Sequence, residues 1–254
     1  MNRMIGICKL CKKQKELQRK CHIIPEFFYS DSSLFHNNHN LVKSDLSYFL
    51  KTGKIRIISP RQKSGEYDLY TYCKDCDGVI FNRLETYAKK ILFSKSLPLT
   101  HQYKYIETPN SITISNIDYT KFKLFFLSIL FRLGISTREL FKEVTLDDRI
   151  DELRDMILNC NPKSDKEFPI IIWDSYYDLQ ISRDYLFQPI GMSAGDDKGS
   201  LFGIGGILIY FGYDMNLIPY SNFLEYRLKE EGAIIIVHLY SNQAWDLINH
   251  WYNK

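Results

Sequence analysis

Two short stretches, Cys8-Lys9-Leu10-Cys11 and Cys73-Lys74-Asp75-Cys76, decide how the N-terminal third of this chain folds. Each stretch has two residues between a pair of cysteines, in a chain of 254 residues that holds six cysteines. This spacing is typical of a zinc knuckle, in which a tight turn lets two thiolates reach one tetrahedral ion at about 2.3 Å. Together the pairs predict one closed structural zinc site with four ligands, namely Cys8, Cys11, Cys73 and Cys76.

Redox chemistry is the alternative for each cysteine pair. A thioredoxin-like C-x-x-C follows a strand and begins a helix, whereas Cys8 has little chain before it in which to form that strand. Zinc is therefore the favoured interpretation. Cys21 and Cys160 are then left unpaired, which argues for a reducing compartment and against a disulfide framework. Because no apolar run approaches the ~20 residues of a membrane span, we expect a cytoplasmic protein without membrane contact.

Charge is distributed unevenly along the chain. The formal net charge is +3, but residues 1 to 95 hold 18 Lys and Arg against 9 Asp and Glu, and the remainder is acidic. A basic surface is what contact with the phosphates of DNA or RNA requires. A solvated basic face without a partner is the alternative. We expect the phosphate contacts from the first basic segment, that is from Lys12, Lys13, Lys15, Arg19 and Lys20.

The segments around the cysteine pairs follow a recognisable order. Cys21-His22-Ile23-Ile24-Pro25 is an apolar segment that ends at a proline, and residues 66 to 72 alternate as a strand that leads into the second pair. From Asp77 to about Phe93 the apolar residues follow helical spacing, so the second pair stands at the start of a helix. The order of knuckle, strand, strand and helix resembles a treble-clef zinc finger.

The same motifs resemble those of the HNH endonuclease family over residues 1 to about 95. Members with a four-cysteine zinc site contain C-x-x-C, then an acidic residue or histidine before His-Ile-x-Pro, and finally a second C-x-x-C before His or Asn. The three matching stretches here are Cys8 to Cys11, Cys21-His22-Ile23-Ile24-Pro25 and Tyr72-Cys73-Lys74-Asp75-Cys76-Asp77. The resemblance implies nucleic-acid binding, phosphodiester hydrolysis with Mg²⁺ or Mn²⁺, and a role in bacterial defence against foreign DNA.

The resemblance makes His22 and Asp77 the candidate catalytic residues. In that family, the histidine at the position of His22 acts as general base on a water, and a divalent cation steadies the leaving oxygen. Asp77 would help to hold this cation. Cys21 departs from the pattern, because many members have a hard ligand there and sulfur is a poor partner for Mg²⁺. No asparagine stands at the usual spacing for the middle position of the motif.

Each candidate catalytic residue also has a structural interpretation. His22 could be a buried histidine that bonds the backbone across the zinc core. Asp77 could stabilise the dipole in the first turn of its helix. A non-catalytic treble-clef module with a degenerate HNH site is therefore the second hypothesis for function.

The rest of the chain predicts a different architecture. Residues 96 to 117 read as a connector, and residues 118 to 254 as an α+β domain that could take a protein partner. An apolar run from Tyr119 to Leu133 predicts a buried helix, and β-branched runs at 168 to 173, 200 to 213 and 233 to 240 indicate an antiparallel sheet. A last helix is expected from Asn242 to Tyr252. The predicted fold class is α+β: a treble-clef zinc domain, then a helical section and an antiparallel-sheet domain.

Overall fold

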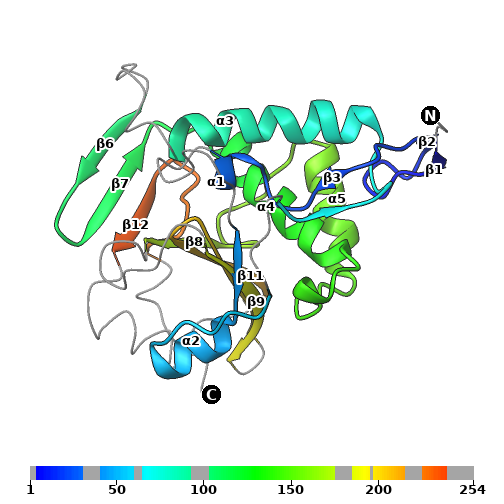
Figure 1. The fold of residues 1–254 in the computed structure, drawn as a ribbon. Helices are drawn as coiled ribbons and strands as arrows, with labels where there is room; N and C mark the ends of the chain where they lie inside the picture. Colours follow the sequence, from blue (N-terminus) through cyan, green and yellow to red (C-terminus); the bar gives the residue numbers. More distant parts are fainter. Residues whose placement is uncertain are drawn as a thin grey trace.

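The chain is described by a computed structural model over residues 4–30, 41–59, 65–92, 103–174, 185–194, 197–214 and 225–238. These residues form a mixed α+β fold, built on one large sheet of eight strands and two small two-stranded sheets (Figure 1). The fold class predicted from the sequence is thereby confirmed. The expected helix from Asn242 to Tyr252 lies outside the described residues.

Helices and strands are interspersed along the sequence. The helices are α1 (Phe27–Ser30), α2 (Leu46–Thr52), the π-helical η1 (Asp75–Phe81), α3 (Asn82–Leu92), α4 (Tyr119–Ile135), the 3-10 helix η3 (Glu139–Phe141) and α5 (Arg149–Leu158). The strands of the small sheets are β1 (Ile5–Ile7), β2 (Gln14–Glu16), β3 (Cys21–His22) and β5 (Tyr67–Asp68). The large sheet contains β4 (Val42–Ser44), β6 (Lys104–Glu107), β7 (Ser111–Ser115), β8 (Ile170–Asp174), β9 (Tyr185–Ala194), β10 (Asp197–Ile204), β11 (Ile207–Asp214) and β12 (Ile234–His238).

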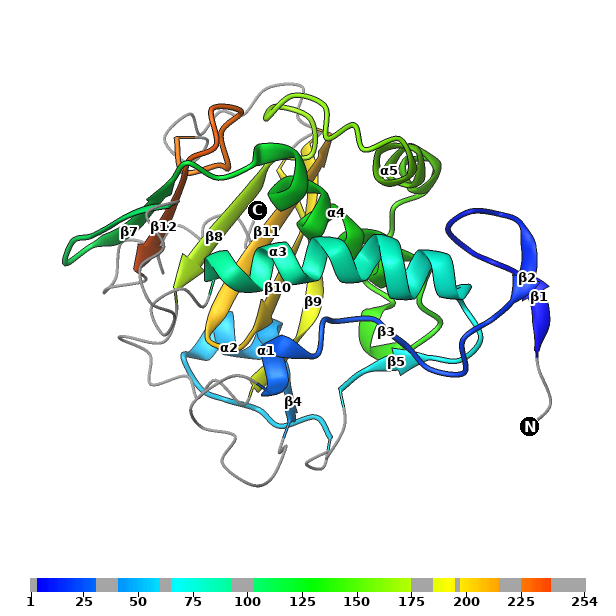
Figure 2. The same ribbon diagram turned by 90° about the horizontal axis from the view of Figure 1, so that it is seen from above.

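The N-terminal elements follow the order expected from the sequence. Strands β1 and β2 form an antiparallel hairpin around the first cysteine pair, and β3 pairs with β5, which leads into the second pair. The helical segment after that pair begins as the π-helical turn η1 and continues as α3. Figures 1 and 2 show the β1–β2 hairpin at one end of the molecule, away from the large sheet.

The large sheet draws strands from all three regions distinguished in the sequence. Its order is β4-β9-β10-β11-β8-β12-β7-β6. Strand β4 comes from the insertion between the cysteine pairs, and the β6–β7 hairpin comes from the predicted connector. The β4–β9 and β8–β12 pairs are parallel and the others antiparallel, so the sheet is mixed where a purely antiparallel one was expected.

Helix α4 is the centre of the core. It is apolar nearly all round and buried from Phe122 to Leu133, as the sequence predicts. It packs against α3 and α5 on one face of the large sheet, and α2 covers the opposite face through Leu46, Phe49 and Leu50 (Figure 2). Alternate residues of β8 pack against the helices on the two faces of the sheet, because successive side chains of a strand point to opposite faces.

The β-branched run from residue 200 to 213 contains the turn of a hairpin. Strands β10 and β11 pair in antiparallel fashion, with Ile204 opposite Ile207. The two residues between them are Gly205 and Gly206, with φ of 62° and 84°. A two-residue turn with positive φ at both positions favours glycine, because a side chain there would clash with the backbone. The antiparallel pairing expected for this run is therefore found within the run itself.

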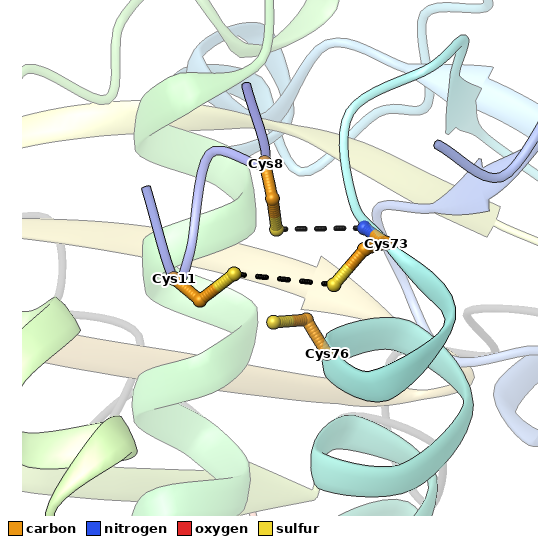
Figure 3. A group of neighbouring side chains, drawn as sticks. All are labelled: Cys8, Cys11, Cys73 and Cys76. Carbon is orange, nitrogen blue, oxygen red and sulfur yellow. Dashed lines mark hydrogen bonds between the residues drawn. The ribbon is translucent and has the colours of Figure 1, made fainter. Parts of the chain in front are cut away.

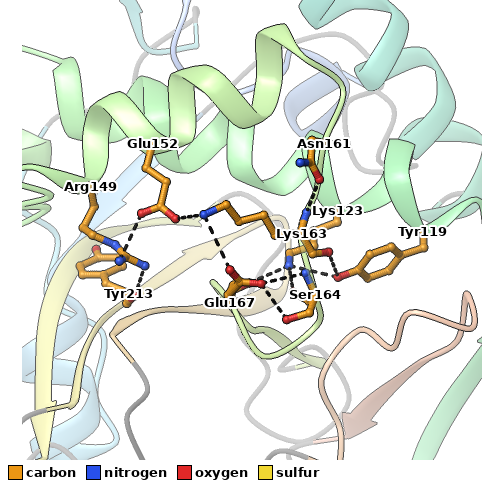
Figure 4. Close-up of polar contacts among 9 residues, drawn as sticks. All are labelled: Tyr119, Lys123, Arg149, Glu152, Asn161, Lys163, Ser164, Glu167 and Tyr213. Atoms are coloured by element: carbon orange, nitrogen blue, oxygen red, sulfur yellow. Dashed lines mark hydrogen bonds and ion pairs between the residues drawn. The ribbon is translucent and has the colours of Figure 1, made fainter.

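Helix α4 also buries an amine. The Nζ of Lys123 donates hydrogen bonds to the carbonyl oxygens of Ser164 and Glu167, at 2.5 and 2.6 Å, and to the Tyr119 hydroxyl at 3.1 Å (Figure 4). These bonds fasten the loop between α5 and β8 onto the core. The side chain of Lys123 is 1% exposed, and this burial lowers its pKa to about 8.

Stability is expected to rise with pH between about 8 and 10.5 because of Lys123. In this range the unfolded chain holds a proton on the amine and the folded chain does not, so raising the pH favours folding. A lysine pKa lowered from its ordinary 10.5 to about 8 corresponds to roughly 3 kcal/mol over the range. Urea unfolding of the wild-type protein and of Lys123→Met at several pH values gives the free energy of unfolding of each. The difference between the two isolates the contribution of Lys123, because both proteins share the other titrating groups.

The difference between the two proteins should depend on pH and not only on the substitution. Lys123→Met is expected to lower the free energy of unfolding at every pH, because it leaves two carbonyl oxygens without their donor. Above pH 8, the free energy of unfolding of the wild-type protein should rise with pH relative to that of the variant. Parallel pH curves for the two proteins would contradict this account of the buried amine.

Candidate metal centre and its surroundings

The two cysteine pairs meet at one point. Cys8 and Cys11 lie in the turn between β1 and β2, Cys73 precedes η1, and Cys76 lies in its first turn. The four Sγ atoms all lie within 4.8 Å of one another (Figure 3). The sequence prediction that these residues form one group is thus confirmed in its geometry.

Backbone hydrogen bonds shape the first cysteine turn. The Cys8 amide donates to the Lys13 carbonyl at 3.0 Å, and the Lys12 amide donates to the Cys8 carbonyl at 2.9 Å. Lys12 has a φ of 58°, the left-handed conformation that closes such a turn. The Cys73 amide also donates to Cys8 Sγ at 3.4 Å, so a hydrogen bond joins the two pairs directly. Such a bond stabilises negative charge on a metal-binding thiolate.

The cysteine group fits a tetrahedral zinc ion. Four sulfurs at about 2.3 Å from one ion are about 3.8 Å apart, and Cys11 Sγ lies 3.9 Å from Cys73 Sγ. All four thiols are free of disulfides, and Cys8, Cys73 and Cys76 are buried. A hydrogen bond from Cys76 lowers the pKa of the Cys8 thiol to about 4, so at least one thiolate forms readily. These residues could hold a metal ion such as zinc, whose role there would be to join the two segments.

His22 and Asp77 lie beside this centre on different elements. His22 is half-buried on β3, opposite Tyr67 of β5. Asp77 follows Cys76 directly in η1. Burial raises the pKa of Asp77, whereas the positive charges of Arg132 and of His22 act to lower it. His22 and Asp77 are therefore close enough to interact electrostatically.

The part of the chain that the structure describes has no second cluster of metal ligands beside this pair. Within the described ranges, the four cysteines are the one group of three or more His, Cys, Asp or Glu side chains tight enough to hold an ion. Cys21 lies in the core with no exposed surface, and the Tyr72 amide donates to its Sγ at 3.4 Å. Burial raises the pKa of Cys21 to about 11, so it is a protonated packing residue. Two further histidines between the cysteine pairs, His36 and His39, lie outside the described residues.

Two charged residues of this region were not singled out from the sequence. Arg132 of α4 donates hydrogen bonds to the His22 carbonyl at 3.1 Å and to Glu85 Oε1 at 2.7 Å. Glu85 lies on α3, two turns after Asp77, and its charge raises the pKa of Asp77. The sequence carries one signal for Arg132, namely a charge within an otherwise apolar helix.

The five predicted phosphate-binding residues divide into two kinds. Lys12, Lys13, Arg19 and Lys20 are exposed. Lys15 is half-buried and forms an ion pair with Asp75 at 2.6 Å, and the Nζ of Lys20 lies 4.5 Å from the centre of the Tyr67 ring. Lys12, Lys13 and Arg19 are therefore the better candidates for contact with a polyanion, because Lys15 would have to leave its carboxylate partner and Lys20 its aromatic ring.

Comparison with known proteins adds no relative. Protein-family models, curated proteins and solved structures give no match to this chain. Its candidate site is therefore described by its own residues alone. Among the described residues, no helix is both long and apolar enough to cross a membrane.

Proposed function

We propose that this chain is a zinc-stabilised nucleic-acid-binding protein of HNH-like build that hydrolyses phosphodiester bonds. In this proposal Cys8, Cys11, Cys73 and Cys76 hold a structural zinc ion. His22 acts as general base on a water, and Asp77 helps to bind Mg²⁺ or Mn²⁺. The basic N-terminal segment binds the phosphates of DNA or RNA.

The proposal is supported by one observation: His22 is among the groups whose charge acts on Asp77, the acidic residue that directly follows the last of the four clustered cysteines. Asp77 and His22 are separated by 55 positions in the sequence, yet the charge of His22 acts on the pKa of Asp77. The pairing of β3 with β5 and the four cysteines together produce this proximity. A general base next to a carboxylate is the minimum that metal-assisted hydrolysis requires of the protein.

A non-catalytic binding module is the second candidate. It is favoured by the lack, within the described ranges, of a further cluster of hard ligands around His22. It is also favoured by Cys21, a protonated and buried thiol where a cation ligand would otherwise stand. Incubating zinc-loaded protein with Mg²⁺ or Mn²⁺ and with duplex DNA, single-stranded DNA and RNA separates the candidates, because only a nuclease yields shorter products.

Replacing Lys12, Lys13 and Arg19 together by alanine is expected to lower the affinity for nucleic acid. The affinity of the variant should also depend less steeply on salt concentration. Each neutralised phosphate contributes roughly 0.9 to the slope of log affinity against log salt for duplex DNA. Loss of three contacts should therefore reduce the slope by roughly 3. Fluorescence anisotropy with a labelled duplex, from 50 to 200 mM salt, measures it.

A matched control removes the same charge elsewhere. Lys104, Lys166 and Lys198 are exposed and lie outside the N-terminal third. Their replacement by alanine lowers the net charge equally and should leave the salt slope unchanged. Equal slopes for both triple variants would favour a solvated basic face, and no binding by the wild-type protein at low salt would count against nucleic acid as the partner.

A further inference from the structure

Helix α4 carries a second buried cation, and it reaches the candidate site. Arg132 is 1% exposed, although it lies in the last turns of an otherwise apolar helix. Its Nη1 donates to the His22 carbonyl at 3.1 Å and to Glu85 Oε1 at 2.7 Å. Its Nε donates to the Ser128 carbonyl at 3.1 Å, and its Nη2 to the Ser128 hydroxyl at 3.3 Å. The guanidinium also lies 4.8 Å from the centre of the Phe81 ring.

This set of contacts holds the guanidinium in one orientation. A buried charge is costly unless it is paired and hydrogen-bonded, and the Glu85 carboxylate supplies the opposite charge. The planar guanidinium has donors in fixed directions, so the bonds to Ser128 and Glu85 leave little freedom at Nη1. The position of the His22 carbonyl is therefore set by α4, whose Arg132 lies 110 residues further along the chain.

The backbone at His22 also pairs with a neighbouring strand. Strand β3 consists of Cys21 and His22, and its pairing with β5 spans two residues. The next amide, that of Ile23, donates to the Glu66 carbonyl at 3.0 Å. The bond from Arg132 is thus a side-chain contact to the backbone of His22 that adds to this short ladder.

We propose that Arg132 is a positioning residue, which fixes the backbone of His22 so that the imidazole faces the site beside Asp77. The inference rests on the proposed function, in which His22 is the general base. Misplacement of a catalytic group by about 1 Å can cost roughly 10²-fold in rate. Arg132 itself is buried and touches no solvent, so it acts through His22 and not on a substrate.

The test is the variant Arg132→Lys, which keeps the positive charge beside Glu85 but cannot form the same set of bonds. With zinc bound, at a temperature where the far-UV circular dichroism of the variant equals that of the wild-type protein, we expect kcat to fall roughly 10²-fold. KM should change less than about twofold, because no substrate contact is lost. A purely structural arginine predicts a lower melting temperature with an unchanged kcat per folded molecule.

Lys123→Met is the matched control. It removes the other buried cation of α4, whose hydrogen bonds go to the carbonyl oxygens of Ser164 and Glu167 and not to His22. It should lower the melting temperature and leave kcat unchanged. If Arg132→Lys does not fold, Glu85→Gln replaces it: weakening the ion pair should lower kcat several-fold with KM unchanged, and an unchanged kcat would overturn the proposal.

A readout that does not need cleavage separates the two proposals. In protein labelled with ¹⁵N-histidine, the ring signals of His22 should shift or broaden in Arg132→Lys and remain unchanged in Lys123→Met. If the wild-type protein is inert but the ring signals behave in this way, the nuclease proposal fails and the positioning role stands. Ring signals of His22 that are identical in Arg132→Lys and wild type would overturn the positioning role.

Discussion

Replacing Cys76 by serine is expected to release the zinc ion and to unfold the N-terminal third of the chain. The four cysteines join a hairpin at residue 8 to a helix that begins beyond residue 73, and they are part of the same buried cluster as α4. Apparent binding energies of structural zinc sites reach about 10–16 kcal/mol in finger peptides, and this energy is folding energy. Zinc content by plasma mass spectrometry and the melting temperature measure the loss on one preparation.

Cys160→Ser is the control for this experiment. Cys160 is an exposed cysteine outside the four-cysteine group, so its replacement should leave one zinc ion per chain and an unchanged melting temperature. Chelation of the wild-type protein should reproduce the effect of Cys76→Ser. Wild-type protein purified without chelator that contains much less than one zinc ion per chain would refute the site.

The cysteine centre could be predicted from the sequence because its chemistry is encoded locally. Two residues between cysteines set a turn that brings both sulfurs to one ion, whatever the rest of the fold does. The buried helix α4 could be predicted for a similar reason, since a run of apolar residues over four turns can only be covered by the core. The observed ends of the elements differ from the predicted ones by a few residues. The helix after the second cysteine pair, for example, was predicted from Asp77 and begins as η1 at Asp75.

The parts that escaped prediction depend on contacts between distant segments. Strand β4 has three residues, and nothing in them indicates that they pair with β9, more than 140 residues later. Helix α2 did leave a local signal, with Asp45 as N-cap and Gly53 in the left-handed conformation at its end. The Gly205-Gly206 turn also has a local sequence signal, because two consecutive glycines favour a two-residue hairpin turn. Arg132 left no such signal for its partners, because a charge in an apolar helix indicates burial and pairing but not which carbonyl it will meet.

Under the proposed function, the rate of cleavage should fall by roughly 10²- to 10⁴-fold when His22 is replaced by alanine, which is the range for loss of a general base. Zinc content should not change, since His22 is outside the cysteine group. The main chain should hardly change either, because Arg132 binds the carbonyl oxygen of residue 22, which alanine retains. Initial rates with Mg²⁺ or Mn²⁺, together with the melting temperature, measure the two effects on the same preparation.

The outcome distinguishes a catalytic from a bracing histidine. If the imidazole only bonds neighbouring groups of the N-terminal region, His22→Ala leaves a buried polar group unpaired. This costs about 1–3 kcal/mol of stability and leaves the cleavage rate per folded molecule unchanged.

Asp75→Asn is the matched control for Asp77→Asn. Asp75 lies in the same π-helical turn as Asp77, but it is 68% exposed and paired with Lys15. Asp75→Asn should leave cleavage intact, whereas Asp77→Asn should reduce it and raise the Mg²⁺ concentration needed for half-maximal rate. Equal rates for both asparagine variants would remove Asp77 from the site, and a rate unaffected by His22→Ala would favour the binding module.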